Sequence, residues 1–284
     1  MTYIGQPVKR VEGADKVTGK AKYAAEFNVP ELTYGYVVSS ALVKGKITSI
    51  DTSEALALPG VLEVFTHENR PKTAWFDMNY TDMDAPPGSP FRPLHDEKIK
   101  YSGQPIALVV AETFELARYA ASLVKATYEQ EAHETDLEAH LLEARDPAVG
   151  VSSLLKPPPP KPRGNADMAM MAADVSIKAR HVHGPQHHNP MEMFATTVEY
   201  GKEDKDGKPY LTIYDKTQGA YNSQLYVAQI FDLPFSHVRV ISPYVGGGFG
   251  SGLRPQYQLF LAVMASKALK RSVRVTLTRQ QMFT

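Results

Sequence analysis

Hydrophobic and polar positions define a first strand, turn and strand near the beginning of the chain. Residues 34–43 and 61–66 are rich in β-branched and aromatic side chains, which is typical of strands. Between them, residues 51–60 begin with Asp-Thr-Ser and end with Pro-Gly, a pattern that predicts a short capped helical turn. This first pass therefore predicts a β-α-β unit.

A second pass follows the same plan more clearly. Residues 104–112 predict a strand, and residues 113–130 predict a helix that Thr113 caps. The residues between the two passes, 80–98, are Pro-rich and polar, so we expect a long surface loop there. The predicted apolar stripe of the helix consists of Leu116, Ala120, Leu123 and Val124.

A run of prolines at residues 156–165 interrupts the pattern of alternating elements. Proline lacks the backbone N–H that helices and sheets use, so this run predicts an extended segment. An interdomain linker is the simpler interpretation, and docking on a proline-binding module is the alternative. The sequence thus predicts an α/β domain over residues 1–150, a Pro-rich linker over 151–170 and a second domain over 171–284.

The second domain opens with predicted strands and then a helix. Residues 175–201 alternate at both ends as strands do, and residues 210–218 are expected to pair with them across a charged turn. Residues 219–234 carry apolar side chains at helical spacing and end at Pro234. Further on, the pattern predicts strands at 237–245 and 271–279 and a helix at 257–270.

A glycine-rich loop joins the strand at 237–245 to the helix at 257–270. The dinucleotide-binding fingerprint fails in every register, and the P-loop pattern meets Leu253 and Arg254 where it needs Lys and Ser or Thr. Several glycines still allow backbone N–H groups to approach a ligand that a Cβ would obstruct. The loop predicts a polar or oxyanionic ligand, with a tight turn as the alternative. Its glycines are Gly246, Gly247, Gly248, Gly250 and Gly252.

Composition removes several classes of function. The chain has 284 residues, of which 31 are basic and 31 acidic, so no net field attracts nucleic acid or an anionic membrane. It has no cysteine, which excludes disulfides, thiolate zinc sites, cysteine nucleophiles and cysteine-ligated iron–sulfur clusters on these residues. No apolar run spans a bilayer and the first residues lack a secretory core. We expect a cytoplasmic protein, or a periplasmic one if a partner carries the signal.

Several motifs resemble the molybdenum-binding large subunit of the xanthine dehydrogenase and aldehyde oxidase family. They are VGGGFG at 245–250, the TQ pair at 217–218 and HHNPMEMFATTVEY at 187–200. Residues 5–27, 58–64 and 103–113 are similar to the opening α/β hammerhead domain of that family. The stretch at 32–51 is most similar to bacterial aldehyde oxidoreductase molybdenum subunits.

The resemblance implies an α+β fold, with a hammerhead-like domain followed by the first part of a molybdopterin-binding domain. It implies a molybdenum-dependent oxidoreductase that hydroxylates aldehydes or aromatic heterocycles with oxygen from water. The implied cofactor is molybdopterin with molybdenum, in its cytosine dinucleotide form. The implied partners are the C-terminal remainder of the molybdenum subunit, an Fe–S subunit and a FAD subunit.

The resemblance also assigns roles to single residues. Gln218 corresponds to a glutamine that donates a hydrogen bond to an oxygen ligand of molybdenum. Phe249 corresponds to a phenylalanine whose backbone N–H faces the metal's oxygen and whose ring lines the substrate funnel. The backbone would pass the cofactor at Gly247, Gly248 and Gly250. Molybdenum itself takes no ligand from these residues.

Leu253 marks a departure from the purine-oxidising members, which have an acidic residue at this position of the pocket. An apolar side chain cannot bond a purine edge, so aldehydes or aromatic heterocycles are the expected substrates. The glutamate that acts as the family's base lies several hundred residues beyond Thr284, so we expect no catalytic residue here and no activity from this chain alone. A non-catalytic assembly module and an unrelated anion-binding protein are the alternatives.

Two further groups of residues are weaker candidates. His181, His183, His187 and His188 lie close together in sequence and can be imagined as a metal site, although no acidic residue completes the set. Glu192 matches a family acidic residue near the pocket wall. A structural role or a partner contact suits Glu192 as well as catalysis does, and we do not expect it to be the base.

Overall fold

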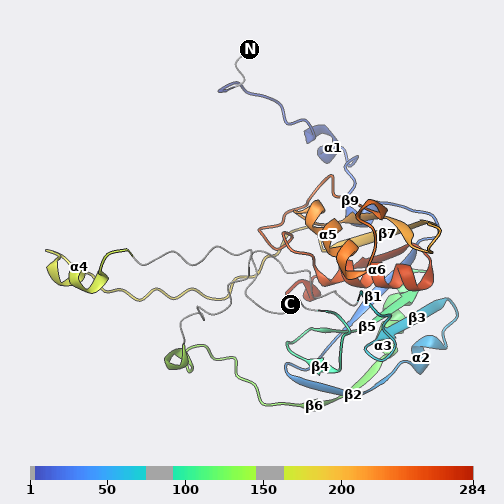
Figure 1. The fold of residues 1–284 in the computed structure, drawn as a ribbon, viewed down its shortest axis with the longest axis horizontal. Coiled ribbons are helices and arrows are strands. Elements are labelled where there is room, and N and C mark those ends of the chain that lie inside the picture. Colours follow the sequence, from blue (N-terminus) through green and yellow to red (C-terminus); the bar gives the residue numbers. More distant parts are fainter. Residues whose placement is uncertain (1–3, 75–91, 145–162, 284) are drawn as a thin grey trace. The chain divides into compact units, whose positions relative to one another are not determined.

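The computed structural model describes residues 4–74, 92–144 and 163–283 (Figure 1). It combines helices and strands, which confirms the α+β expectation. The chain divides into two compact units, which we describe separately. The larger unit comprises Met1–Thr81, Pro90–His133 and His188–Thr284, and the smaller comprises Asp82–Ser89 and Glu134–His187.

A seven-stranded sheet dominates the larger unit and joins strands from distant parts of the sequence. Its order is β3-β5-β1-β10-β7-β8-β9. The β1–β10 and β8–β9 pairs are parallel and all other neighbours are antiparallel. Thr33 on β1 pairs with Val273 on β10, so both ends of the sequence share this sheet. The strands are β1 (Thr33–Ser39), β3 (Val61–Thr66), β5 (Pro105–Ala111), β7 (Ala195–Glu203), β8 (Pro209–Asp215), β9 (Val238–Ile241) and β10 (Val273–Thr276).

The predicted first β-α-β unit forms, although another strand lies between its two strands in the sheet. Helix α2 (Ser53–Leu56) does lie between β1 and β3, but β5 separates these two strands in the sheet and is antiparallel to both. Strand β5 is buried along its whole length because helices cover both of its faces. The apolar run at 104–112 is therefore continuous, as is typical of a central strand.

A second sheet of three strands corrects the predicted helix at 113–130. Helix α3 (Phe114–Leu123) begins at the Thr113 cap, whose Oγ1 accepts a hydrogen bond from Leu116 N, but it ends at Leu123. Residues 125–130 form β6 (Lys125–Gln130), which pairs antiparallel with β2 (Gly45–Asp51). Strand β4 (Lys98–Ile99) completes this sheet on the other side of β2.

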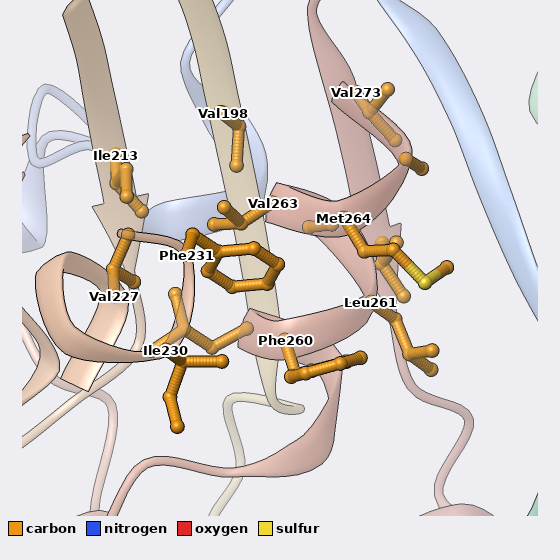
Figure 2. Packing of buried hydrophobic residues seen from close by; sticks show 14 of the residues in the cluster. Val198, Ile213, Val227, Ile230, Phe231, Phe260, Leu261, Val263, Met264 and Val273 are labelled. Carbon is orange, nitrogen blue, oxygen red and sulfur yellow. The ribbon is translucent and has the colours of Figure 1, made fainter. Parts of the chain in front are cut away.

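Helices cover the two faces of the seven-stranded sheet with different cores. Alternate residues of β5 separate the faces, since Ala107 and Val109 pack with α2 and α3 while Leu108 and Val110 belong to the larger core. That larger core contains α5 (Ala220–Ile230) and α6 (Tyr257–Leu269) (Figure 2). Figure 2 shows Phe231 beside Phe260. The centroids of these two rings are 5.2 Å apart.

The remaining elements are short. In the larger unit they are α1 (Gly13–Val17), η1 (Ala24–Glu26), η4 (Phe235–His237) and η5 (Gln280–Phe283). The described part of the smaller unit contains η3 (Leu141–Glu143) and α4 (Ala166–Ala172).

Residues 175–194 contain no strand, so the strand predicted at the start of 175–201 is wrong, whereas the strand predicted at its end forms β7. The side chains of residues 175–187 are exposed, so their alternation lacks a core to pack against. Most of the predicted Pro-rich linker, and residues 80–91 of the predicted surface loop, lie outside the described residues.

Candidate functional site

Four chain segments meet at one edge of the seven-stranded sheet. Strands β8 and β9 are parallel neighbours connected by α5, so both of their carboxyl ends lie at this edge, where open α/β sheets bind ligands. Strand β7 starts here because it is antiparallel to β8, and β10 ends here because it is antiparallel to β7. Backbone hydrogen bonds from Lys216 N to Ala195 O (3.0 Å) and from Leu277 N to Phe194 O (2.8 Å) continue the pairing past the strands.

Gln218, just after β8, is held against the glycine loop that follows β9. Its backbone N donates to Gly252 O at 2.8 Å, and its side-chain Oε1 accepts from Gly250 N at 3.2 Å and Gly252 N at 3.1 Å. Backbone N–H groups only donate, so the oxygen of the amide must face the loop. The Nε2 group of Gln218 consequently points away and has no hydrogen-bond partner among the described residues.

The absence of a Cβ at Gly248 permits this contact. An ideal Cβ on Gly248 would lie 2.3 Å from Gln218 Oε1, far inside any allowed approach. The structure therefore brings together two of the predicted site residues, Gln218 and Gly248, through a close contact that the sequence motif does not reveal by itself.

The middle of the loop presents unused backbone donors. The N–H groups of Gly247, Gly248 and Phe249 donate no hydrogen bond to any of the described residues. Gly247 and Gly250 have φ values of +94° and +92°, which glycine adopts freely, and Phe249 has φ +53°, which is uncommon for a residue with a side chain. Such a turn with free N–H groups suits a ligand that carries oxygen atoms.

Phe249 and Leu253, the two predicted pocket residues, have exposed side chains. Phe249 is 69% exposed and Leu253 is 56% exposed. Exposed apolar side chains next to unused N–H groups can contact the apolar part of a ligand whose polar part the backbone binds.

Glu192, just before β7, holds the other end of the loop. Its Oε2 accepts a hydrogen bond from Gly246 N at 2.6 Å, and its backbone N donates to Gly246 O at 3.2 Å. Burial raises the pKa of the Glu192 carboxyl, while the Gly246 N–H and the charge of Lys216 act in the opposite direction. The carboxylate therefore contacts the loop backbone directly.

Lys216 is a functional candidate that the sequence did not suggest. It is only 1% exposed, and its Nζ lies 3.7 Å from the centroid of the Phe194 ring, a cation–π contact. Burial lowers the pKa of Lys216, and the charges of Glu192 and Asp215 act against that effect. In the sequence, the signal that could have indicated Lys216 is its position near the end of a predicted strand, shortly before Gln218. Its burial, which is unusual for a lysine, is visible only in the structure.

Asp215 ties β7, β8 and α5 together beneath the site. Its carboxyl oxygens accept hydrogen bonds from Thr196 Oγ1 at 2.6 Å and Ser223 Oγ at 2.9 Å. Complete burial raises the pKa of Asp215 to about 6. Thr217 extends the network to the loop, since its Oγ1 donates to Gly252 O at 3.2 Å.

Arg279, after β10, fixes the segment that precedes Glu192. Its guanidinium donates to Asn189 Oδ1 at 2.7 Å, to Met191 O at 2.9 Å and to Pro190 O. Pro190 lies close to the loop, since an ideal Cβ on Gly247 would be 3.2 Å from the Cβ of Pro190. The segment before β7 thus packs against the glycine loop. This arrangement depends on tertiary contacts, so no local sequence pattern indicates it.

The histidines do not form the imagined metal site. His181 and His183 lie in a stretch without strand structure. Within residues 4–74, 92–144 and 163–283, no group of three or more His, Cys, Asp or Glu side chains is arranged to hold a metal ion. In the same ranges no helix combines the length and apolar character needed to cross a membrane.

Comparison with known proteins finds two matching family models, in sequence order. Residues 18–132 match the aldehyde oxidase and xanthine dehydrogenase a/b hammerhead domain. Residues 156–284 match the molybdopterin cofactor-binding domain. The chain thus carries a cofactor-binding domain of the molybdopterin type.

Individual relatives agree with these matches. The chain is 37% identical over 278 residues to the aldehyde oxidoreductase molybdenum-binding subunit PaoC of Escherichia coli K12, covering 97% of this chain and 35% of that protein. It is 31% identical over 282 residues to the putative xanthine dehydrogenase molybdenum-binding subunit XdhA of the same strain, covering 96% and 36%.

A solved structure shares the fold. The CO dehydrogenase of Oligotropha carboxidovorans superposes with a TM-score of 0.78 at 26% identity, covering 98% of this chain and 35% of that one. The chain therefore spans about a third of the length of these relatives.

Proposed function

Because the chain belongs to the aldehyde oxidase and xanthine dehydrogenase family, we propose that Gln218 and the glycine loop form one wall of its molybdopterin cofactor site. The observation that carries this proposal is the fixed Gln218 amide, whose oxygen is held by Gly250 N and Gly252 N and whose Nε2 is free to donate. The N–H groups of Gly247, Gly248 and Phe249 add donors on the same loop.

The residues present fit this cofactor. The unused donors of Gln218 and of the loop are neutral N–H groups, which bind oxygen atoms without requiring a counter-charge. When bound, the cofactor supplies the redox centre at which an oxygen atom from water is inserted into a carbon–hydrogen bond. Gln218 and the loop hold and orient that centre without ligating the metal. Phe249 places an exposed ring beside these donors, where it can limit how a substrate approaches.

The wider protein is proposed to be a molybdenum hydroxylase of aldehydes or aromatic heterocycles. The 37% identical relative is the molybdenum-binding subunit of an aldehyde oxidoreductase, which supports this class. We further propose the cytosine dinucleotide form of the cofactor, with Fe–S and FAD centres on partner subunits. The absence of cysteine from these 284 residues is consistent with electron transfer centres elsewhere. The general base is proposed to lie on the C-terminal remainder of the subunit, so this chain alone is expected to be inactive.

Leu253 supports aldehydes over purines as substrates. Its exposed apolar side chain offers no hydrogen bond to a purine edge, and an unpaired polar edge costs about 1–3 kcal/mol. We expect kcat/KM for benzaldehyde to exceed that for hypoxanthine by about 5- to 150-fold in the assembled enzyme.

The cofactor wall is tested with the Gln218→Glu variant. The variant is made in the whole polypeptide that the gene encodes. A glutamate keeps an oxygen for Gly250 N and Gly252 N but cannot donate from the other atom, so it separates holding the loop from binding the cofactor. Molybdenum content and aldehyde oxidation are measured. Loss of an oriented donor typically lowers kcat by about 10²–10³.

The matched control is Gln229→Glu, the same change at an exposed position of α5. Loss of molybdenum or of turnover in Gln218→Glu alone supports the proposal. Wild-type molybdenum content and turnover in Gln218→Glu would overturn it. Phosphorus without molybdenum in the wild-type protein would favour an anion-binding module instead.

A further inference from the structure

We propose that Glu192 is a positioning residue for the glycine loop and that Lys216 is the buried positive charge that keeps it in place. This inference rests on the proposed function, because it concerns the same cofactor wall. It adds that the Glu192 carboxylate, which does not contact the cofactor, sets the direction of the loop's free N–H groups.

The contact between Glu192 and Gly246 is reciprocal. The side chain of Glu192 accepts from Gly246 N at 2.6 Å, and its backbone N donates to Gly246 O at 3.2 Å. An ideal Cβ on Gly246 would lie 2.6 Å from Glu192 Cβ, so the two backbones approach as closely as glycine permits. Both polar groups of the Gly246 residue are thereby fixed.

The fixed position of Gly246 determines the direction of the backbone N–H groups of the residues that follow it. Gly247 follows with φ +94°, and the three unused N–H groups begin at this residue. The loop has few other polar anchors on this side, because the Gln218 contacts lie at Gly250 and Gly252. A shift at Gly246 would therefore redirect the N–H groups of Gly247, Gly248 and Phe249.

Lys216 supplies a charge that Glu192 needs. Glu192 Oε1 and Lys216 Nζ are both buried, and neither has a hydrogen-bond partner in the part of the chain that the structure describes. A buried carboxylate without an opposite charge is unfavourable, and so is a buried ammonium group. The other charges that act on this pair are Glu26 on Glu192, and Asp215 and Arg279 on Lys216.

Asp215 and Arg279 are already engaged elsewhere. The carboxyl of Asp215 accepts two hydroxyl hydrogen bonds, and the Arg279 guanidinium is bound to residues 189–191. These hydrogen bonds do not remove the charges of Asp215 and Arg279, but Glu192 is the charge that acts most strongly on Lys216, ahead of Asp215. Methionine has a similar length to lysine and no charge, so Lys216→Met removes the charge while keeping most of the packing.

The experiment measures amide hydrogen exchange of the peptide that covers residues 245–253, by mass spectrometry. The polypeptide is expressed from its own reading frame in cells grown without molybdate, so exchange reports on the loop and not on a bound cofactor. The variants are Glu192→Ala, Glu192→Gln, Lys216→Met and the double variant Glu192→Gln/Lys216→Met. The control is Glu199→Gln, the same change on β7 away from the loop.

For the hydrogen-bonded N–H groups of the loop, first of all that of Gly246, we expect exchange about tenfold faster in Glu192→Ala and in Lys216→Met. Glu192→Gln retains an oxygen acceptor, so it should stay within about threefold of the wild type. The double variant removes both charges and should restore slow exchange to Lys216→Met. A merely structural role for Lys216 predicts no such rescue, because the added change would only add its own cost.

Two results would overturn the inference. One is wild-type exchange in Glu192→Ala, and the other is equally fast exchange in Lys216→Met and the double variant. If Glu192→Ala does not fold, Gly246→Ala tests the same contact, because its methyl group meets Glu192 Cβ, and slow exchange there also overturns the inference. Molybdenum content of protein from molybdate-grown cells separately tests the cofactor wall, so the two proposals fail independently.

Discussion

Helix α6 and the glycine loop that precedes it are stabilised in opposite ways. Every residue of α6 from 258 to 266 is buried, and its side chains pack against several elements of one large core. The loop has few side chains, and hydrogen bonds from polar side chains fix its backbone, among them those of Gln218, Glu192 and Thr217. Many weak contacts place the helix, whereas a few hydrogen bonds place the loop. Stability and site geometry can therefore be changed separately.

The largest expected effect comes from the core. Phe260→Ala removes a fully buried ring that contacts Phe231, and such truncations cost about 3–5 kcal/mol of unfolding free energy. Urea unfolding measures this loss, with Phe260→Leu as the control at less than about 1.5 kcal/mol. Below its melting temperature, Phe260→Ala should leave exchange of the loop unchanged. Faster loop exchange in Phe260→Ala than in the wild type would contradict the separation of the two regions.

A smaller effect is expected from Asp215, which connects the core to the site. The pKa of Asp215 is raised to about 6 from an ordinary value of 3.8, so the folded state holds a proton that the unfolded state has lost. Its contribution to stability is full below pH 3.8 and is lost as the pH rises through about 6. Ionising it in the folded protein costs of the order of 3 kcal/mol.

Asp215→Asn should therefore abolish this part of the pH dependence. Between pH 4 and pH 8 the wild type should lose about 2–3 kcal/mol more than the variant, measured by urea unfolding at constant salt. Asp206→Asn, at an exposed turn, is the control. Parallel pH curves for wild type and Asp215→Asn would show that Asp215 is ionised in the folded protein at no cost.

The smallest effect on stability is expected at Gly248. An added methyl group meets the end of the Gln218 side chain, which can move, so Gly248→Ala should cost less than about 1 kcal/mol. It should nevertheless lower molybdenum content, because Gln218 Oε1 leaves Gly250 N and Gly252 N. Gly248→Ala/Gln218→Ala should cost no more than Gln218→Ala alone. A larger loss of unfolding free energy in the double variant would show that the methyl group at position 248 clashes with a group other than the Gln218 side chain.

Elements with a strong local pattern were predicted well from the sequence. The helix expected at 257–270 is α6 (Tyr257–Leu269), and the strand expected at 61–66 is β3. The helix expected over 113–130 was too long because β6 depends on distant pairing, such as Tyr128 with Ile47. Helical spacing alone does not indicate that β2, about eighty residues earlier in the sequence, pairs with these residues.

The candidate site was predicted in part. The motif led to Gln218 and the glycine loop, which the structure brings into contact. Their role toward the cofactor stays a prediction, as does the division into domains at 1–150, 151–170 and 171–284. Lys216 and Arg279 were missed, because their importance comes from residues that are adjacent only in space. Glu192 was considered, but only its contact with Gly246 indicates what it does.

The parallel pairing of β1 with β10 has a consequence for the timing of synthesis. Thr33 donates two hydrogen bonds to Ser272 O, from its N and its Oγ1, across 239 positions of sequence. At about 5–20 residues per second, a ribosome needs about ten to fifty seconds to reach Ser272 after making Thr33. During this interval the nascent chain exposes an apolar strand with one edge unpaired, which is a template for aggregation. Yield in cells should therefore depend on chaperones that bind the first hundred residues while the ribosome completes the last.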